Sequence, residues 1–219
     1  MSAIHVLRQA KVLTGFLVLV AVGALTASDA RAANSAETFV QSNIERSYAI
    51  LNDDTVDASE RHERFRTLLV SIVDVHRVAL FTLGPYARNA SQADLGTFER
   101  AFTDFMTGVY QRGLRTYSSP KVTGSTERAT DDVIVNVTAN SPNGRGSLAF
   151  RVRGIGPDRP MITDLQVEGA WLAIAQRSDF TAYLQQHGGN LAALAAELDK
   201  RAAQVRLALG GSEVHRRQQ

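Results

Sequence analysis

The side chains best suited to catalysis in this chain are five histidines and two pairs of adjacent aspartates. His62 lies on the charged face of a predicted helix, His76 begins the next helix, and His187 precedes a pair of glycines. None of the three has a second histidine or carboxylate at ligand spacing on its own helical face, apart from ordinary surface acids. The string from His62 to Arg66 also lacks the second histidine of the zinc protease motif. The histidines therefore predict no metal site.

The paired aspartates, Asp53-Asp54 and Asp131-Asp132, fall in predicted loops or strand entries, where aspartate is a common turn residue. The chain contains no cysteine, no Gly-x-Ser-x-Gly elbow and no glycine-rich phosphate loop. We therefore expect no enzyme and no cofactor. One alternative stays open, an enzyme that uses His76 or Asp131 as its base.

The N-terminus has the three parts of a secretory signal peptide. Arg8 and Lys11 form a cationic region, an apolar run follows from Val12 to Leu25, and Ala30-Arg31-Ala32 offers small residues at positions −3 and −1 of a cut. The apolar run is shorter than the roughly 20 residues that a membrane-spanning helix needs. We expect cleavage after Ala32 and export to the periplasm; the alternative is a retained N-terminal anchor.

Cleavage would remove most of the excess positive charge. Residues 1–32 hold three of the 24 basic residues and one of the 22 acidic residues, which leaves 21 of each in the mature chain. A near-neutral chain without a concentrated basic face does not suit nucleic acid. We expect no nucleic-acid partner.

The mature chain begins with a series of helices. Apolar residues recur at helical spacing in four segments, with Ser59 as the expected cap of the second and Ser91 as that of the fourth. The fourth segment is the longest, and Phe98, Phe102, Phe105, Met106 and Val109 form a broad apolar stripe along it. Two more helices, Leu172 to Gln186 and Leu191 to Leu207, end the domain.

A period of two replaces the helical period between these two groups of helices. Apolar residues alternate with polar ones around Val133–Thr138, Leu148–Arg153 and Met161–Glu168, and Ser141-Pro142-Asn143-Gly144 is a strong turn signal. We predict three long antiparallel strands and a weaker fourth at Lys121–Glu127. The fold class is α+β, a curved antiparallel sheet of about four strands packed with helices. Helices packed on such a sheet can fill the interior completely or can leave an apolar cavity between them and the sheet.

Several segments occur in an order that resembles a known family. They are Leu83-Gly84-Pro85-Tyr86-Ala87-Arg88, then Asp164-Leu165-Gln166-Val167-Glu168-Gly169, then Gln176-Arg177-Ser178-Asp179-Phe180. Their order and spacing, over about residues 37–205, resemble the MlaC, or toluene-tolerance, family of periplasmic lipid-binding proteins. Ala170-Trp171 and the absence of a tryptophan near Tyr86 depart from the family pattern.

The resemblance implies an NTF2-like sheet with added helices around an apolar cavity. It also implies a carrier that shuttles phospholipid between an outer-membrane lipoprotein complex and an inner-membrane ABC transporter, and so maintains outer-membrane asymmetry. On this basis we divide the chain into a signal peptide (1–32), a lipid-binding domain (33–207) and a disordered tail (208–219).

The expected lipid-binding residues come from the apolar stripe of the long helix, from one face of the strands and from the point where the last helices begin. These are Phe98, Phe102, Phe105, Met106, Val109, Val135, Leu148, Phe150, Val152, Leu165, Val167, Trp171 and Leu172. Asp164 and Arg177 match family positions, and we assign them structural roles. Two alternatives remain besides the enzyme: a binding protein for hopanoid or another hydrophobic solute, and a protein-interaction subunit whose core is full.

Overall fold

The computed structural model describes the backbone of residues 16–129, 131–154 and 159–217, and side chains from residue 33 to residue 209 within these ranges. The predicted signal peptide, residues 1–32, therefore lies outside the residues whose side chains are described, and it stays a prediction. Among the described residues, no helix combines the length and the apolar character that crossing a membrane requires.

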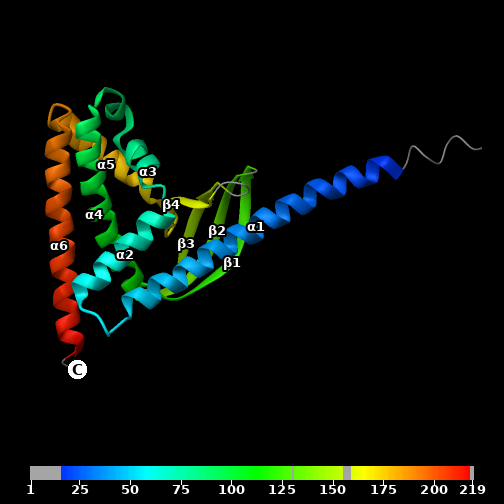
Figure 1. The fold of residues 1–219 in the computed structure, drawn as a ribbon, viewed down its shortest axis with the longest axis horizontal. Helices are drawn as coiled ribbons and strands as arrows, with labels where there is room; N and C mark the ends of the chain where they lie inside the picture. The colour runs from blue at the N-terminus through cyan, green and yellow to red at the C-terminus, as the bar shows by residue number, and fades with distance from the viewer. Residues whose placement is uncertain (1–15, 130, 155–158, 218–219) are drawn as a thin grey trace, which may run out of the picture.

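The described chain folds into six α-helices, one short 3-10 helix and one sheet of five strands (Figure 1). In chain order these are α1 (Phe16–Leu51), α2 (Ala58–Ile72), α3 (Val75–Leu83), η1 (Gly84–Asn89), α4 (Gln92–Thr116), β1 (Ser118–Ala129), β2 (Asp132–Ser141), β3 (Gly144–Arg153), β4 (Met161–Val167), β5 (Ala170–Trp171), α5 (Leu172–Gln186) and α6 (Leu191–Arg217). The predicted α+β class is confirmed, with a fifth, two-residue strand added at the edge.

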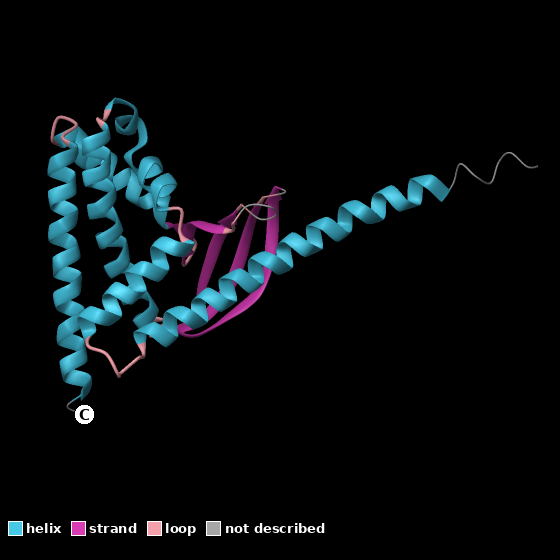
Figure 2. Ribbon diagram, in the orientation of Figure 1, coloured by secondary structure: helices cyan, strands magenta, loops and turns pink. Residues whose placement is uncertain are grey.

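The sheet is antiparallel throughout, and its strands follow one another in chain order from β1 to β5. Val135 on β2 pairs with Phe150 on β3, which pairs with Leu165 on β4. Since side chains at paired positions share a face, the alternating apolar residues of three strands form one continuous apolar surface. The sheet is open, and helices group beside it while α1 crosses it (Figure 2).

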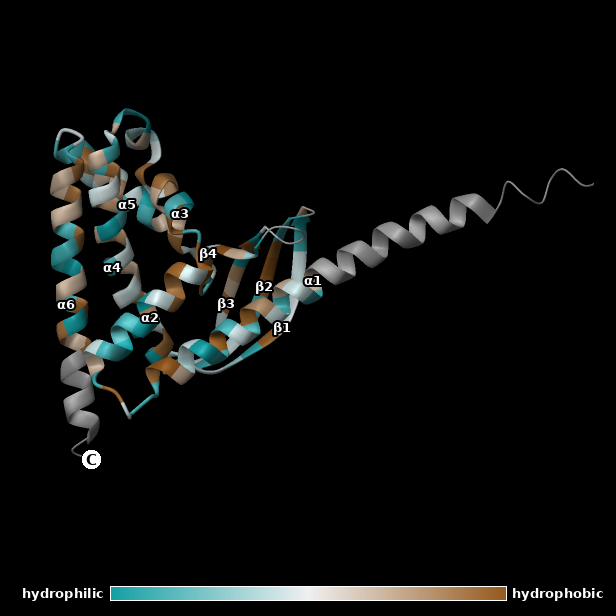
Figure 3. Cartoon of the chain, in the orientation of Figure 1, coloured by the Kyte–Doolittle hydropathy of each residue, from teal (hydrophilic) through white to brown (hydrophobic). Residues whose placement is uncertain are grey.

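Helix α1 covers one end of this apolar surface. Ala36, Val40 and Ile44 recur at four-residue spacing, so they lie on one side of the helix, and all three are buried. They form a cluster with valines of β2 and with Val152 of β3. Apolar colour runs along β2 and recurs along the part of α1 that crosses the sheet (Figure 3), in agreement with this cluster.

Capping residues set where the helices begin. Asp57, rather than the expected Ser59, caps α2 by accepting a hydrogen bond from the Glu60 amide at 2.9 Å. Helix α2 thus begins at Ala58, before the predicted cap. Asp74 caps α3, and Ser91 caps α4 as predicted. Each cap satisfies an amide that the first helical turn leaves without a partner.

The main core lies among the helices α2 to α6. Phe98, Phe102 and Phe180 form a triad with ring centroids 5.6–6.1 Å apart. Gly108 allows a close approach of α4 and α6, since a Cβ added there would lie 3.0 Å from the Val205 side chain. The backbone of α6 remains helical to Arg217, through most of the tail that we expected to be disordered. The division of the chain into signal peptide, domain and tail stays a prediction.

Candidate functional site

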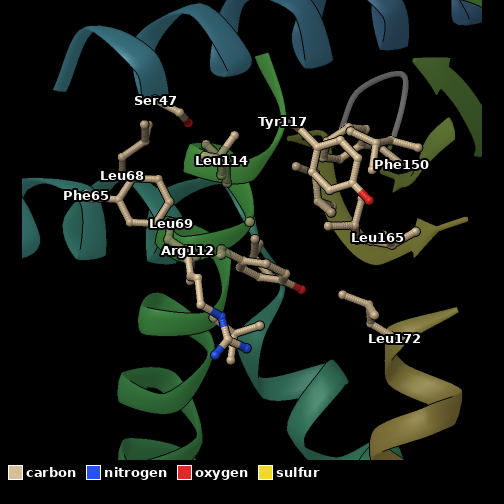
Figure 4. Close-up of a pocket in the computed structure, with 18 of the residues that line it drawn as sticks. Ser47, Phe65, Leu68, Leu69, Arg112, Leu114, Tyr117, Phe150, Leu165 and Leu172 are labelled. Carbon is tan, nitrogen blue, oxygen red and sulfur yellow. The ribbon is translucent and has the colours of Figure 1, made fainter. Parts of the chain in front are cut away.

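An apolar cavity of about 290 Å³ lies between the uncovered end of the sheet and the helices α1, α2, α4 and α5 (Figure 4). Phe65, Leu68 and Leu69 of α2 form one wall, and Phe150 and Leu165 belong to the strands. The end of α4, from Val109 to Thr116, and Ser47 of α1 line the other sides. The cavity is thus the space between these elements that their side chains do not fill.

Six of the thirteen predicted lipid-binding residues line this cavity. They are Val109, Leu148, Phe150, Leu165, Val167 and Leu172. The four strand residues alternate on β3 and β4 and face the same side, as the period of two required. Whether these residues contact lipid stays a prediction.

The apolar stripe near the start of α4 does not line the cavity, contrary to our expectation. Phe98, Phe102 and Met106 are at most 1 % exposed and belong to the main core, and Phe105 packs against the same core. The reason is that α6 and Phe180 of α5 cover this part of the helix. Of the five stripe residues, Val109, nearer the end of α4, is the one that lines the cavity.

The remaining three predicted residues also lie elsewhere. Val135 and Val152 are fully buried in the cluster beneath α1, on the face of the sheet that also carries the lining strand residues. Trp171 is half-buried at the start of α5 and does not line the cavity. Its strand pairs only with the end of β4, at the margin of the sheet.

Sequence reasoning missed lining residues mainly on α2 and at the end of α4, together with Ser47 of α1 and Ile162 of β4. The missed residues are Ser47, Phe65, Leu68, Leu69, Ile72, Val73, Tyr110, Arg112, Gly113, Leu114, Thr116, Tyr117 and Ile162. The periodicity of α2 predicts that its lining residues form a buried stripe. It does not distinguish a side chain that packs against another side chain from one that faces a cavity.

One margin of the cavity is held by polar contacts around Tyr117. The Tyr117 hydroxyl donates to Glu168 Oε1 at 3.3 Å, and Tyr48 donates its hydroxyl to the Tyr117 carbonyl. The same Glu168 oxygen accepts from the Ser147 amide at 3.2 Å. Gly146 makes room for this cluster, because a Cβ there would lie 2.6 Å from the Tyr117 ring. Four segments distant in sequence are thereby joined beside the cavity.

Asp164 is a half-buried carboxylate next to the lining residue Leu165. It accepts from the Leu165 amide at 2.8 Å and from the Ala173 amide at 3.0 Å, so it serves the first turn of α5, where Trp171 provides no side-chain cap. Burial raises the pKa of Asp164, and the two amides and Arg151 partly offset that effect. Its structural assignment agrees with these contacts, although its hydrogen bonds go to backbone amides rather than to a basic side chain.

Arg177 likewise makes structural contacts. Its guanidinium donates to the Phe81 carbonyl at 3.2 Å and lies 4.9 Å from the centroid of the Phe81 ring. These contacts join α5 to α3.

The candidate catalytic groups lie away from the cavity. His76 contacts Glu99 at 2.9 Å and His62 contacts Gln111 at 2.8 Å. Neither His76 nor Asp131 lines the cavity. Within the described part of the chain, no group of three or more histidine, cysteine, aspartate or glutamate side chains could hold a metal ion.

Comparison with known proteins places this geometry in context. The sequence model of the MlaC family, described as MlaC protein, matches residues 41–200, which include every residue that lines the cavity. Among solved structures, the chain is similar to a phospholipid-binding protein from Ralstonia solanacearum in complex with a phospholipid, with 20% identity and a TM-score of 0.64. The match covers 77% of this chain and 97% of that chain. A comparison with curated proteins found no match.

Proposed function

Because this chain belongs to the MlaC family, as the order of its segments predicted, we propose that it is a periplasmic lipid carrier. In this proposal the cavity holds phospholipid acyl chains, and the protein shuttles lipid between an outer-membrane lipoprotein complex and an inner-membrane ABC transporter. The result is the maintenance of lipid asymmetry in the outer membrane. Members of the family are lipid-binding carriers rather than known enzymes.

The observation that carries the proposal is the apolar cavity itself. Its volume is about 290 Å³, and Arg112 is the only charged residue among the described residues that line it. Since a cavity of about 150 Å³ holds benzene, this one has room for on the order of a dozen carbon atoms. Each buried methylene contributes about 0.8 kcal/mol, so ten of them contribute about 8 kcal/mol without any covalent chemistry.

The direct test is to identify the lipid that co-purifies with the protein. The full chain would be expressed in a Gram-negative host, recovered from the periplasm and studied by native mass spectrometry and lipidomics. We expect diacyl phospholipid, and a mass that corresponds to cleavage after Ala32. Triterpenoid without phospholipid would instead favour the hopanoid alternative. A protein that contains no lipid and takes up none would favour the interaction-subunit alternative.

A matched pair of substitutions tests whether the cavity is the binding site. Leu165 lines the cavity on β4, whereas Ile134 lies on the opposite face of the same sheet. Leu165→Trp fills part of the cavity, and displacing two methylenes would cost about 1.6 kcal/mol, which is more than tenfold in lipid retention. Ile134→Trp should retain lipid as the wild type does. Equal retention by both variants would place the lipid elsewhere.

The shuttling role requires a test in cells. Loss of the protein should raise the amount of phospholipid in the outer leaflet, measured by labelling surface amine head groups with an impermeant reagent. Complementation with Ile134→Trp should restore the wild-type level, and complementation with Leu165→Trp should not. If Leu165→Trp restores asymmetry while it retains no lipid, the carrier role is wrong.

A further inference from the structure

Five side chains in the wall of the apolar cavity carry hydrogen-bond donors, and three of these donors are already used by the protein. The Ser47 hydroxyl donates to the Asn43 carbonyl at 2.7 Å, and the Thr116 hydroxyl donates to the Arg112 carbonyl at 3.0 Å. The Tyr117 hydroxyl donates to Glu168. None of these three groups needs a partner from a ligand.

The other two donors are the Tyr110 hydroxyl and the Arg112 guanidinium. Neither makes a side-chain hydrogen bond or an ion pair with any other residue in the described part of the chain. Burial, together with the nearby Asp164 carboxylate, raises the pKa of Tyr110, so its hydroxyl remains a protonated donor. The cavity therefore presents two donors, one of them cationic, and an otherwise apolar wall.

The two donors differ in their depth. Arg112 and Thr116 are the exposed members of the cavity wall, and they are one helical turn apart on α4, so the cavity opens on that side. Figure 4 shows Arg112 as an extended side chain on α4, away from Tyr117 and Phe150. Tyr110 is half-buried and thus lies further from solvent than Arg112. An amphiphile that enters chain first would leave its head group beside Arg112.

We infer that the cavity selects amphiphiles with an anionic head, in which Arg112 binds the anionic oxygens at the opening and Tyr110 donates to an ester carbonyl further in. This inference rests on the proposed function and adds to it a ligand class and two residue roles. A guanidinium suits phosphate or carboxylate oxygens because it offers several donors in one plane. An ester carbonyl would supply an acceptor to the Tyr110 hydroxyl, which has no acceptor among the described residues.

The test for Arg112 measures lipid retained after incubation with vesicles of defined composition. Wild-type protein should retain phosphatidylglycerol in preference to diacylglycerol, which has the same chains but no anionic group. Arg112→Gln should lower retention of phosphatidylglycerol roughly fivefold, as expected of an ion pair at an exposed site, and leave diacylglycerol unchanged. Arg128→Gln, a change at an exposed arginine on β1 outside the cavity wall, is the matched control.

Two further measurements characterise the role of Arg112: one separates a charge effect from a packing effect, and the other identifies the anionic group that the arginine binds. Added salt should weaken retention of phosphatidylglycerol by the wild type but not by Arg112→Gln, because an exposed ion pair is screened. A long-chain fatty acid in the same assay distinguishes the two sources of anionic oxygen. If Arg112→Gln retains less fatty acid as well as less phosphatidylglycerol, the arginine binds either anion. If it retains less phosphatidylglycerol only, the arginine binds phosphate.

Tyr110→Phe tests the second donor, since it removes one hydroxyl and keeps the ring in the cavity wall. Retention of an ester-linked phospholipid should fall about fivefold, the effect of one hydrogen bond, whereas an ether-linked phospholipid, which lacks the carbonyl, should be unaffected. An equal effect on ester and ether lipids would overturn the role of Tyr110.

The inference and the proposed function fail in different ways. A wild-type protein that retains lipid, with Arg112→Gln identical to it for every lipid and at every salt concentration, overturns this inference alone. A wild-type protein that retains no lipid of any kind overturns the proposed function and the inference with it.

Discussion

The reassignment of the α4 stripe from cavity to core makes a prediction that a pair of substitutions can test. Phe102 is fully buried, and its ring centroid lies 5.6 Å from that of Phe98 and 6.1 Å from that of Phe180. Phe150 lines the cavity instead and is only partly buried. Replacing each with leucine keeps an apolar side chain of similar size but removes the ring.

The expected cost follows from the ring contacts. Each aromatic pair contributes about 0.5–1.5 kcal/mol beyond its buried area, so the loss of two pairs in Phe102→Leu should lower the free energy of unfolding by about 1–3 kcal/mol. Phe150→Leu breaks no such pair, and as a swap of similar volume should cost less than about 1.5 kcal/mol. Lipid retention should change in the opposite order, with Phe150→Leu affected and folded Phe102→Leu near wild type.

Urea unfolding measures the first quantity, and native mass spectrometry of the folded fraction measures the second. Because a single domain has only about 5–15 kcal/mol of stability, the leucine variants are preferable to alanine variants, which could unfold the protein. If Phe102→Leu lost lipid without losing stability, while Phe150→Leu did the reverse, the assignment of Phe102 to the core and of Phe150 to the cavity wall would be wrong.

Two other predictions concern the sheet and the long helix. Asp132 accepts hydrogen bonds from Arg151 at 2.9 Å and from Arg153 at 2.8 Å, and these contacts lower the pKa of its carboxyl. Because a carboxyl with a lowered pKa in the folded state stabilises the fold at pH values above the ordinary aspartate pKa, Asp132→Asn should lower the free energy of unfolding by about 1–2 kcal/mol at pH 7. Urea titrations should show that this difference declines as the pH falls below about 4. On α4, Gly96→Ala meets no neighbour within 4 Å and should raise the free energy of unfolding by up to about 1 kcal/mol, whereas Gly108→Ala places a Cβ 3.0 Å from Val205 and should lower it. Thermal melts of the two variants check this contrast, and equal shifts would contradict the close contact between α4 and α6.

Much of the fold could be predicted because its signals are local. The period of two placed Leu148, Phe150 and Leu165 on one face of a sheet, and the pattern around Ser91 predicted where α4 begins. A side chain's face depends only on the geometry of its own strand or helix, so neighbouring residues suffice to predict it. The order and spacing of the segments that resemble the MlaC family likewise predicted the family, and the match over residues 41–200 confirmed it.

The cavity could be predicted only in part, because a cavity is a property of several elements together. Val135 and Phe150 share one face of the sheet at paired positions, yet α1 covers the first and the second remains open. Helix α4 presents a similar contrast, since α6 covers Phe102 while Val109 reaches the cavity. The periodic spacing of apolar residues in the sequence indicates which side chains are buried. The spacing is the same whether such a side chain packs against protein or lines a cavity.

The sequence by itself therefore determined the elements, the apolar face of each and the family. Only the tertiary structure decided which parts of those faces are filled, because segments far apart in the chain, such as α1 and α6, cover them. The same holds for the polar groups in the wall. Tyr110 and Arg112 are unremarkable as sequence positions, and they become candidate ligand donors only because the fold leaves them, unlike Ser47, without a protein acceptor within the described residues.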